Sequence, residues 1–240
     1  MLKLEDITIR FGGLTAVNAV NMEIGSHEVV GLVGPNGAGK TTLFNAISGL
    51  VRPSSGRIIF GNEDILKLPL HQRARRGIGR SFQIPQPMHQ LTVRENLLVA
   101  QRFGTGKVDQ YKIDEILEFL NLSDKADRNA ATELALTELK ALEVAKALAT
   151  EPRLLLLDEV LAGLEVTGKR RFMSMLKDLH LKYKLGILIV EHDIETISAM
   201  CSRVCVLNFG QLIANGPPEQ VFRDPAVIKS YTGDTGDNNA

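Results

Sequence analysis

The sequence has little cysteine, no long apolar run and no excess of charge of one sign. Its only cysteines are Cys201 and Cys205, too few for a disulfide framework, which is compatible with a cytoplasmic protein. Their four-residue spacing could suggest a pair of metal ligands. We expect instead that Cys201 ends a helix, that Cys205 lies in an apolar strand, and that both are buried free thiols.

Membrane insertion and electrostatic binding of nucleic acid are both disfavoured. No apolar run approaches the length of a membrane span and no signal peptide opens the chain, so work at a membrane would require docking onto other chains. Lys plus Arg and Asp plus Glu each number 28 in 240 residues, which argues against a mainly electrostatic nucleic-acid binder. A local basic patch stays open. A hydrophobic content of 44% supports a real core.

The pattern G-x-x-x-x-G-K-[ST], typical of a phosphate-binding P-loop, occurs at residues 34–41. An apolar run that reads as a strand precedes it, and a helical pattern follows it. Glycines let successive N–H groups face one anion, and the helix N-terminus adds positive charge there. Lys40 would neutralise the β- and γ-phosphates of ATP, and the Thr41 hydroxyl would bind Mg²⁺. The alternative is a glycine-rich turn that fits by chance. The expected nucleotide-binding residues are Gly34, Pro35, Asn36, Gly37, Ala38, Gly39, Lys40, Thr41 and Thr42.

Four leucines at residues 154–157 run directly into two carboxylates, Asp158 and Glu159. Such a run predicts a parallel strand covered on both faces, whose carboxyl end lies at the edge of the sheet where ligands bind. Asp158 would then hold Mg²⁺, directly or through water, and Glu159 would polarise the attacking water. The alternative is a strand that ends in a solvated acidic pair.

The order of patterns along the chain predicts an α/β protein with a helical insertion. Thr92 and Glu95 have the spacing of a capping box at a helix start. We expect a single domain over residues 1–231, with 1–83 and 150–231 as the nucleotide-binding core, 84–149 as a helical subdomain, and 232–240 as a disordered polar tail. The expected strands cover 2–9, 20–24, 28–33, 57–60, 154–157, 186–190 and 203–207; the expected helices cover 41–50, 69–76, 91–101, 113–120, 136–149, 168–184, 194–200 and 217–222.

This motif order resembles that of the ATP-binding subunits of ABC transporters over nearly the whole chain. The resemblance implies a P-loop NTPase core with an N-terminal antiparallel β subdomain and an inserted α-helical subdomain. It implies that Phe11 stacks on adenine, that Gln83 reaches Mg²⁺ and the attacking water, and that His192 contacts the γ-phosphate. The alternatives are a core phenylalanine, a solvated loop glutamine and a structural histidine.

Shorter segments are similar to the branched-chain, or hydrophobic, amino-acid importer subfamily. They are residues 11–17, 79–83, 91–96, 215–221 and 227–233. The resemblance implies an ATPase at the cytoplasmic face of the cell membrane that works with a second ATPase subunit, transmembrane permease subunits and an extracytoplasmic solute-binding protein. Lipopolysaccharide-export and urea-importer ATPases look similar, so an exporter or another importer is an alternative. An ABC protein that binds ribosomes or nucleic acid, or a low-turnover regulatory subunit, is a third possibility.

The chain departs from the family at two places. The signature L-S-G-G-Q is replaced by Leu-Ala-Leu-Thr-Glu at residues 134–138, without the serine hydroxyl and without either glycine. Glu165 stands where the family usually has aspartate. In the family the signature contacts the γ-phosphate bound by the opposite subunit, so the resemblance implies an asymmetric heterodimer in which the site completed by this chain is impaired or slow. A homodimer is the alternative.

Overall fold

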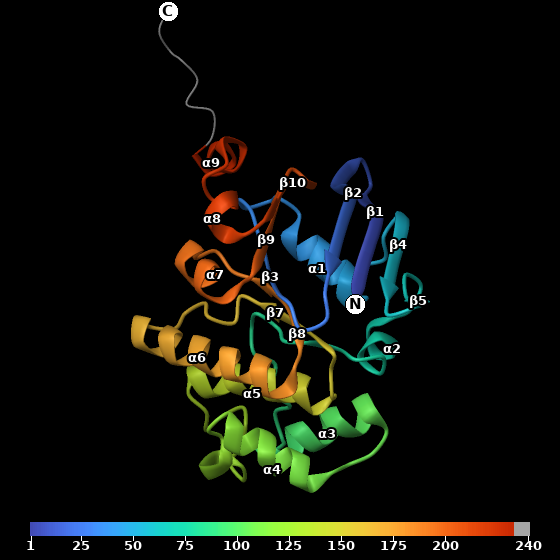
Figure 1. Ribbon diagram of the computed structural model, residues 1–240. Helices are drawn as coiled ribbons and strands as arrows, with labels where there is room; N and C mark the ends of the chain where they lie inside the picture. The colour runs from blue at the N-terminus through green and yellow to red at the C-terminus, as the bar shows by residue number, and fades with distance from the viewer. Residues whose placement is uncertain (233–240) are drawn as a thin grey trace, which may run out of the picture. The chain divides into compact units, whose positions relative to one another are not determined.

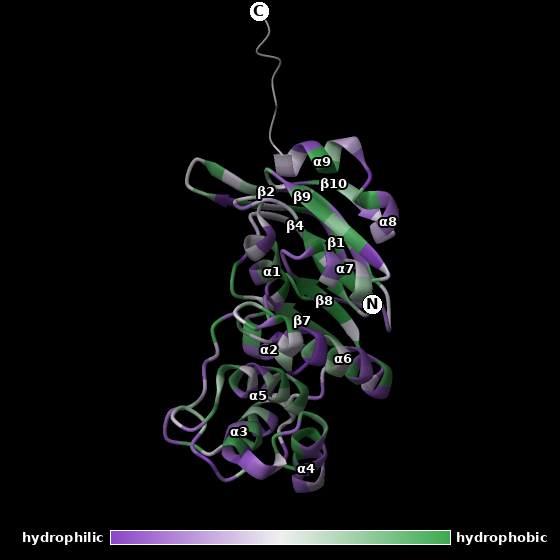
Figure 2. Ribbon diagram, turned by 90° about the vertical axis from the view of Figure 1, so that its left-hand side faces the viewer, coloured by the Kyte–Doolittle hydropathy of each residue, from purple (hydrophilic) through white to green (hydrophobic). Residues whose placement is uncertain are grey.

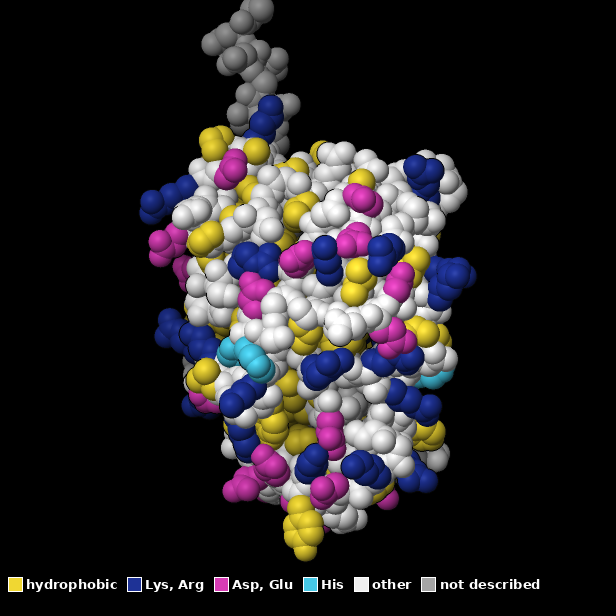
Figure 3. Space-filling model, turned by 45° about the vertical axis from the view of Figure 1, so that its right-hand side comes forward, with side chains coloured by type: hydrophobic (Ala, Val, Ile, Leu, Met, Phe, Trp, Pro, Cys, Tyr) yellow, Lys and Arg dark blue, Asp and Glu magenta, His cyan; other side chains and the backbone are white. Residues whose placement is uncertain are grey.

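The computed structural model describes residues 1–232 and divides into two compact units. Unit 1 comprises Met1–Lys67 together with the described residues from Val190 onward. Unit 2 comprises Leu68–Ile189. None of the helices in the described residues is long and apolar enough to cross a membrane. On the face drawn in Figure 3, basic and acidic side chains are interspersed.

Unit 1 contains an antiparallel sheet with the order β2-β1-β4-β5. Strand β2 begins six residues before the expected position, because a turn at Gly12 and Gly13 brings Leu14 opposite Phe11 on β1. Leu2 and Leu4 alternate with more exposed residues of β1, as one core-facing side requires, and after a register shift Ile7, Thr8 and Ile9 are all buried. The bounds are Leu2–Phe11 for β1, Leu14–Ile24 for β2, Ser55–Phe60 for β4 and Glu63–Asp64 for β5, which the sequence did not predict.

The other strands of unit 1 follow the order β10-β9-β3, with β3 parallel to β9 and β10 antiparallel to it. Helix α7 packs closely on β3: a Cβ placed on Gly31 would lie 3.0 Å from Ile197 and 3.1 Å from Cys201. Strand β10 and helix α9 were not expected, because each is short, mixes apolar and polar residues and lies largely at the surface. The bounds are β3 Val29–Val33, β9 Arg203–Asn208, β10 Gln211–Gly216, α1 Lys40–Ser48, α7 Ile194–Met200, α8 Pro218–Val221 and α9 Pro225–Thr232.

Unit 2 has short strands in the order β8-β7-β6, and β6 pairs with β7 in parallel. They are β6 (Ile78–Arg80), β7 (Leu154–Asp158) and β8 (Gly186–Val190). Every residue of β7 and β8 is buried, and both strands appear apolar in Figure 2. The four leucines therefore do form the doubly covered strand that the sequence predicted.

Helices make up the remainder of unit 2. Helices α3, α4 and α5 pack against one another and lie together in Figure 1. Thr92 and Glu95 form the expected capping box, in which each side chain bonds the other's main-chain N–H. Residue 232, the first of the expected tail, ends α9, and residues 233–240 lie outside the described part of the chain. The bounds are α2 Leu70–Ala74, α3 Val93–Thr105, α4 Gln110–Phe119, a 3₁₀ helix Ser123–Lys125, α5 Leu136–Ala149 and α6 Val166–Tyr183.

Candidate functional site

The glycine loop of unit 1 wraps around the Lys40 side chain between β3 and α1. The Lys40 Nζ donates to the carbonyl oxygens of Gly34 at 2.7 Å and Pro35 at 3.0 Å. Gly39 precedes α1 in the left-handed conformation, with φ of 100°, which favours glycine. The loop therefore presents an ammonium group at the first turn of a nine-residue helix, where main-chain N–H groups add positive potential.

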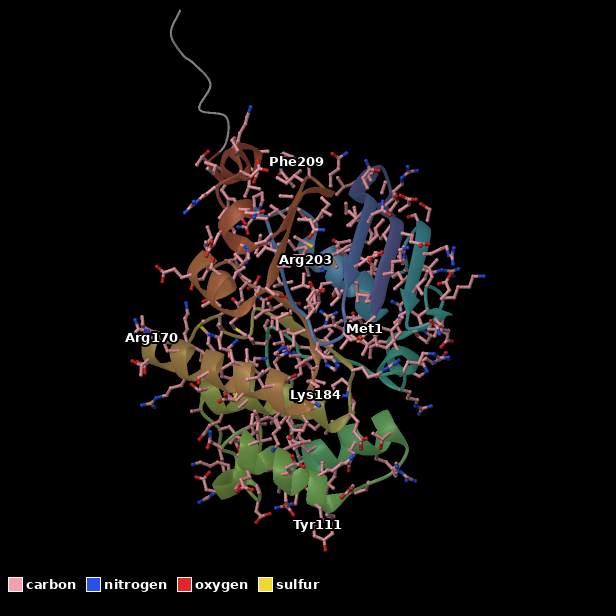
Figure 4. The ribbon with its side chains drawn as sticks, viewed as in Figure 1. Met1, Tyr111, Arg170, Lys184, Arg203 and Phe209 are labelled. Carbon is pink, nitrogen blue, oxygen red and sulfur yellow. The ribbon has the colours of Figure 1, made fainter. Side chains whose placement is uncertain are left out.

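Close packing fixes this loop against neighbouring strands of unit 1. A Cβ on Gly34 would lie 2.1 Å from the carbonyl oxygen of Leu207 in β9, and one on Gly39 would lie 2.5 Å from that of Ala16 in β2. The turn after β9, at which the exposed Phe209 stands in Figure 4, also reaches the loop, because its Gly210 N–H bonds a loop carbonyl at 3.0 Å. No larger residue fits the two glycine positions without moving a backbone.

Phe11 and His192 also belong to unit 1. Phe11 ends β1 and is 51% exposed, so the alternative of a core phenylalanine is wrong. His192 is exposed in the link between β8 and α7, and the next residue, Asp193, caps α7 by accepting from the Glu195 N–H at 3.2 Å.

Asp158 lies buried at the carboxyl end of β7 in unit 2. Its Oδ2 is 3.3 Å from Arg80 Nη2, and the two side chains are only 7% and 8% exposed. Burial raises the pKa of Asp158, and the nearby Arg80 charge opposes this effect. Burial likewise lowers the pKa of Arg80. The guanidinium carbon stands 5.1 Å from the ring centre of Phe82. Sequence reasoning missed Arg80, although its place just before Gln83 was a usable signal.

Glu159 follows in a left-handed conformation, with φ of 46°. Its Oε2 accepts a hydrogen bond from Gln83 Nε2 at 2.5 Å. The buried Lys140 of α5 donates to the Glu159 carbonyl oxygen at 3.3 Å. Unit 2 therefore brings Gln83, Asp158 and Glu159 to one place, as their motifs suggested. Lys140 joins them without a local sequence signal.

The altered signature forms the start of α5. Ala135 is the N-cap residue, with no side-chain oxygen to accept from the first turn. Glu138 turns back instead, and its Oε2 accepts from the Ala135 N–H at 2.8 Å, while its Oε1 lies 3.8 Å from Lys125 Nζ. Glu165 likewise precedes α6 without a side-chain cap, where the shorter aspartate is a preferred capping residue.

The cysteines are buried and free, which confirms the expectation for both. Burial raises the pKa of Cys201 to about 12 and that of Cys205 to about 11. A thiolate is therefore strongly disfavoured at neutral pH.

Comparison with known proteins shows the family. Residues 17–162 match the family model of the ABC transporter, and residues 211–237 match that of the branched-chain amino acid ATP-binding cassette transporter. The chain is similar to the high-affinity branched-chain amino acid transport ATP-binding protein BraF of Pseudomonas aeruginosa, with 37% identity over 98% of each chain. It is also 37% identical, over 98% of each chain, to the lipopolysaccharide export system ATP-binding protein LptB of Haemophilus influenzae.

A solved structure confirms the expected fold class. The crystal structure of the ADP conformation of an ATP-binding cassette of an ABC transporter superposes with a TM-score of 0.87 and 32% identity, covering 97% of this chain and 98% of the other. The chain therefore belongs to the ABC transporter family, as an ATP-binding protein of the branched-chain amino acid subfamily and an ATPase that couples ATP hydrolysis to transport.

Proposed function

We propose that this chain powers an importer for branched-chain or other hydrophobic amino acids. The observation that carries this proposal is the match of residues 211–237 to the branched-chain family model. Overall identity does not discriminate, since a branched-chain transport protein and a lipopolysaccharide export protein are both 37% identical to the chain. For the same reason export is the second candidate.

In this proposal the glycine loop and Lys40 bind the phosphates of ATP. Loop N–H groups and the N-terminus of α1 offer hydrogen bonds to the phosphate oxygens, and Lys40 neutralises the charge that develops during transfer. Phe11 has the exposure needed to offer its ring to adenine. His192 is the residue proposed to contact the γ-phosphate.

The carboxylates of unit 2 suit the magnesium ion that accompanies ATP. No group of three or more His, Cys, Asp or Glu side chains within residues 1–232 is arranged to hold a metal. Mg²⁺ commonly binds through one or two carboxylates plus substrate phosphates, which the buried Asp158 fits, with Thr41 and Gln83 as further oxygen ligands. When bound, the ion neutralises phosphate charge. Glu159, oriented by Gln83, would accept a proton from the attacking water.

The assembly we propose has residues 1–83 and 150–231 as the core of a single domain and residues 84–149 as its helical subdomain. It pairs with a second ATPase subunit at the cytoplasmic face of the membrane, on permease subunits served by a solute-binding protein. The α5 terminus supports asymmetry, because Ala135 has no hydroxyl for a phosphate and Leu136 is exposed beside it. Hydrolysis should then depend mainly on the site that contains Lys40.

The test is purification of a Glu159→Gln chain from gently solubilised membranes with ATP, because blocked hydrolysis should hold the complex closed. Two permeases and a second ATPase with an intact signature are the expected partners, and the assembled transporter should take up a branched-chain amino acid. Recovery of lipopolysaccharide-export components, or of soluble partners without membrane chains, would contradict the proposal. A Lys40→Ala chain that left hydrolysis by the complex at full rate would contradict the asymmetry.

A further inference from the structure

The loop that follows Gln83 is hydrogen-bonded to a largely buried ion pair of α5, Glu143 and Lys146. Glu143 Oε1 accepts the Gln86 main-chain N–H at 2.7 Å, and Lys146 Nζ donates to the Gln86 carbonyl oxygen at 2.6 Å. Lys146 Nζ also donates to Glu143 Oε1 at 2.5 Å. The two side chains are 2% and 14% exposed. Both main-chain polar groups of one loop residue are thus bound by one pair of side chains.

At its other end the same loop is hydrogen-bonded to the candidate catalytic carboxylate of Glu159. Gln83, three residues earlier, donates to Glu159, and the intervening Ile84 is exposed. Because the exposed middle gains little from apolar burial, the polar contacts at its ends determine where the loop lies. The position of the Gln83 amide therefore depends on how Gln86 is held.

Helix α5 contributes to both contacts. Besides Glu143 and Lys146, it carries Lys140, which donates to the Glu159 carbonyl oxygen at 3.3 Å. The helix begins at Leu136, inside the altered signature. A displacement of α5 would therefore act on Glu159 directly, through Lys140, and indirectly, through the loop.

A contribution to folding stability does not by itself explain the Glu143–Lys146 ion pair. A buried ion pair costs desolvation and is often matched by apolar residues of similar volume. Here the charged groups satisfy the main chain of a loop that carries a candidate catalytic residue. Charge-assisted hydrogen bonds of this kind also fix geometry more strictly than apolar contacts do.

We propose that Glu143 and Lys146 are positioning residues for ATP hydrolysis: they hold Gln86 and thereby keep the Gln83 amide against Glu159. This inference rests on the proposed roles of Gln83 and Glu159. It adds a link between the helix of the signature segment and the proton-accepting carboxylate.

Hydrogen exchange on the full chain tests the contact without nucleotide. In Lys146→Met, which keeps the aliphatic stem, the Gln86 main-chain amide, which Glu143 accepts at 2.7 Å, should exchange about tenfold faster than in the unaltered chain. The control is Lys112→Met, the same substitution at a more exposed Lys–Glu ion pair, to Glu151 at 2.8 Å, elsewhere in unit 2. Unchanged exchange in the loop, or equal acceleration in the control, would overturn the proposal.

Kinetics test the positioning role. Lys146→Met should lower kcat for ATP by about tenfold and leave KM within about twofold, because small misplacements of catalytic groups reduce turnover steeply. In a Gln83→Ala background the same change should add little, since it acts through Gln83. If the two substitutions instead lowered kcat independently, so that their effects multiplied, the positioning role would be refuted.

Glu143→Gln, which retains an acceptor for the Gln86 N–H, replaces Lys146→Met if that variant folds poorly. We expect Glu143→Gln to lower kcat as well, but by less. If the complex of the unaltered chain with its partner subunits failed to hydrolyse ATP, the proposed function would fail, while the exchange measurement would still decide whether the ion pair holds the loop.

Discussion

Replacing Ala135 with serine should stabilise the chain and improve the site that we propose α5 completes in a partner subunit. Ala135 is the N-cap of a fourteen-residue helix and has the extended backbone, φ −70° and ψ 163°, in which a serine oxygen accepts from the third helical residue. That residue, Glu138, already bonds the Ala135 N–H at 2.8 Å. The substitution therefore supplies the missing half of a capping box.

The expected gain in the free energy of unfolding follows from substitutions at the N-caps of other helices. Exchanging serine for alanine at an N-cap costs about 1 kcal/mol, so the reverse change should contribute a similar amount. For a chain of this size the thermal midpoint should rise by about 2–4 °C. Ala135 is exposed, so the added hydroxyl meets no packing conflict. The same hydroxyl could donate to a phosphate held by the partner ATPase, so ATP turnover should rise only when both ATPase subunits are present.

Thermal unfolding by circular dichroism, together with ATPase assays on the complex, checks both effects. Ala100→Ser is the matched control, because Ala100 lies inside α3, where serine is a poorer helix former and should lower the midpoint slightly. An unchanged midpoint for Ala135→Ser would refute the cap. A raised midpoint with unchanged turnover of the complex would refute the role of the lost hydroxyl in the proposed asymmetry.

Three other changes have expected outcomes. Arg80→Met removes the cation beside the buried Asp158, so the free energy of unfolding measured in urea should fall by about 3–5 kcal/mol. The control Arg57→Met removes surface ion pairs and should lower it by less than about 1 kcal/mol. Equal losses of stability in the two variants would contradict this reasoning. Gly39→Ala places a Cβ 2.5 Å from a β2 carbonyl, so ATP affinity measured by calorimetry should fall, and unchanged affinity would be inconsistent with the packing. Burial raises the pKa of Cys201 to about 12, so the native thiol should resist alkylation until the chain unfolds, and rapid labelling of the native chain at pH 8 would argue against its burial. The contribution of the buried thiol to the free energy of unfolding is complete below pH 9 and is lost as the pH rises toward 12.

Much of the fold was predictable where the local pattern was strong. The ranges 136–149, 186–190 and 194–200 were predicted to the residue, because each has regular apolar spacing and clear ends. Strand β10 and helix α9 were missed, since short segments of mixed polarity have no clear periodicity and are stabilised by partial burial against neighbours. The early start of β2 follows from pairing with β1, which no short window of sequence displays.

The sequence by itself determined the chemistry that contiguous residues can express. A glycine loop ending in Lys40 and Thr41, and a buried run ending in Asp158 and Glu159, predict phosphate and magnesium chemistry because their neighbours along the chain make the local geometry. Only the tertiary structure decided which polar groups meet across long stretches of the chain. The pairs Arg80–Asp158, Gln86–Glu143 and Lys140–Glu159 join residues 78, 57 and 19 positions apart. Their meeting depends on strand order and helix packing, and these long-range contacts are stabilised by burial that no local pattern encodes.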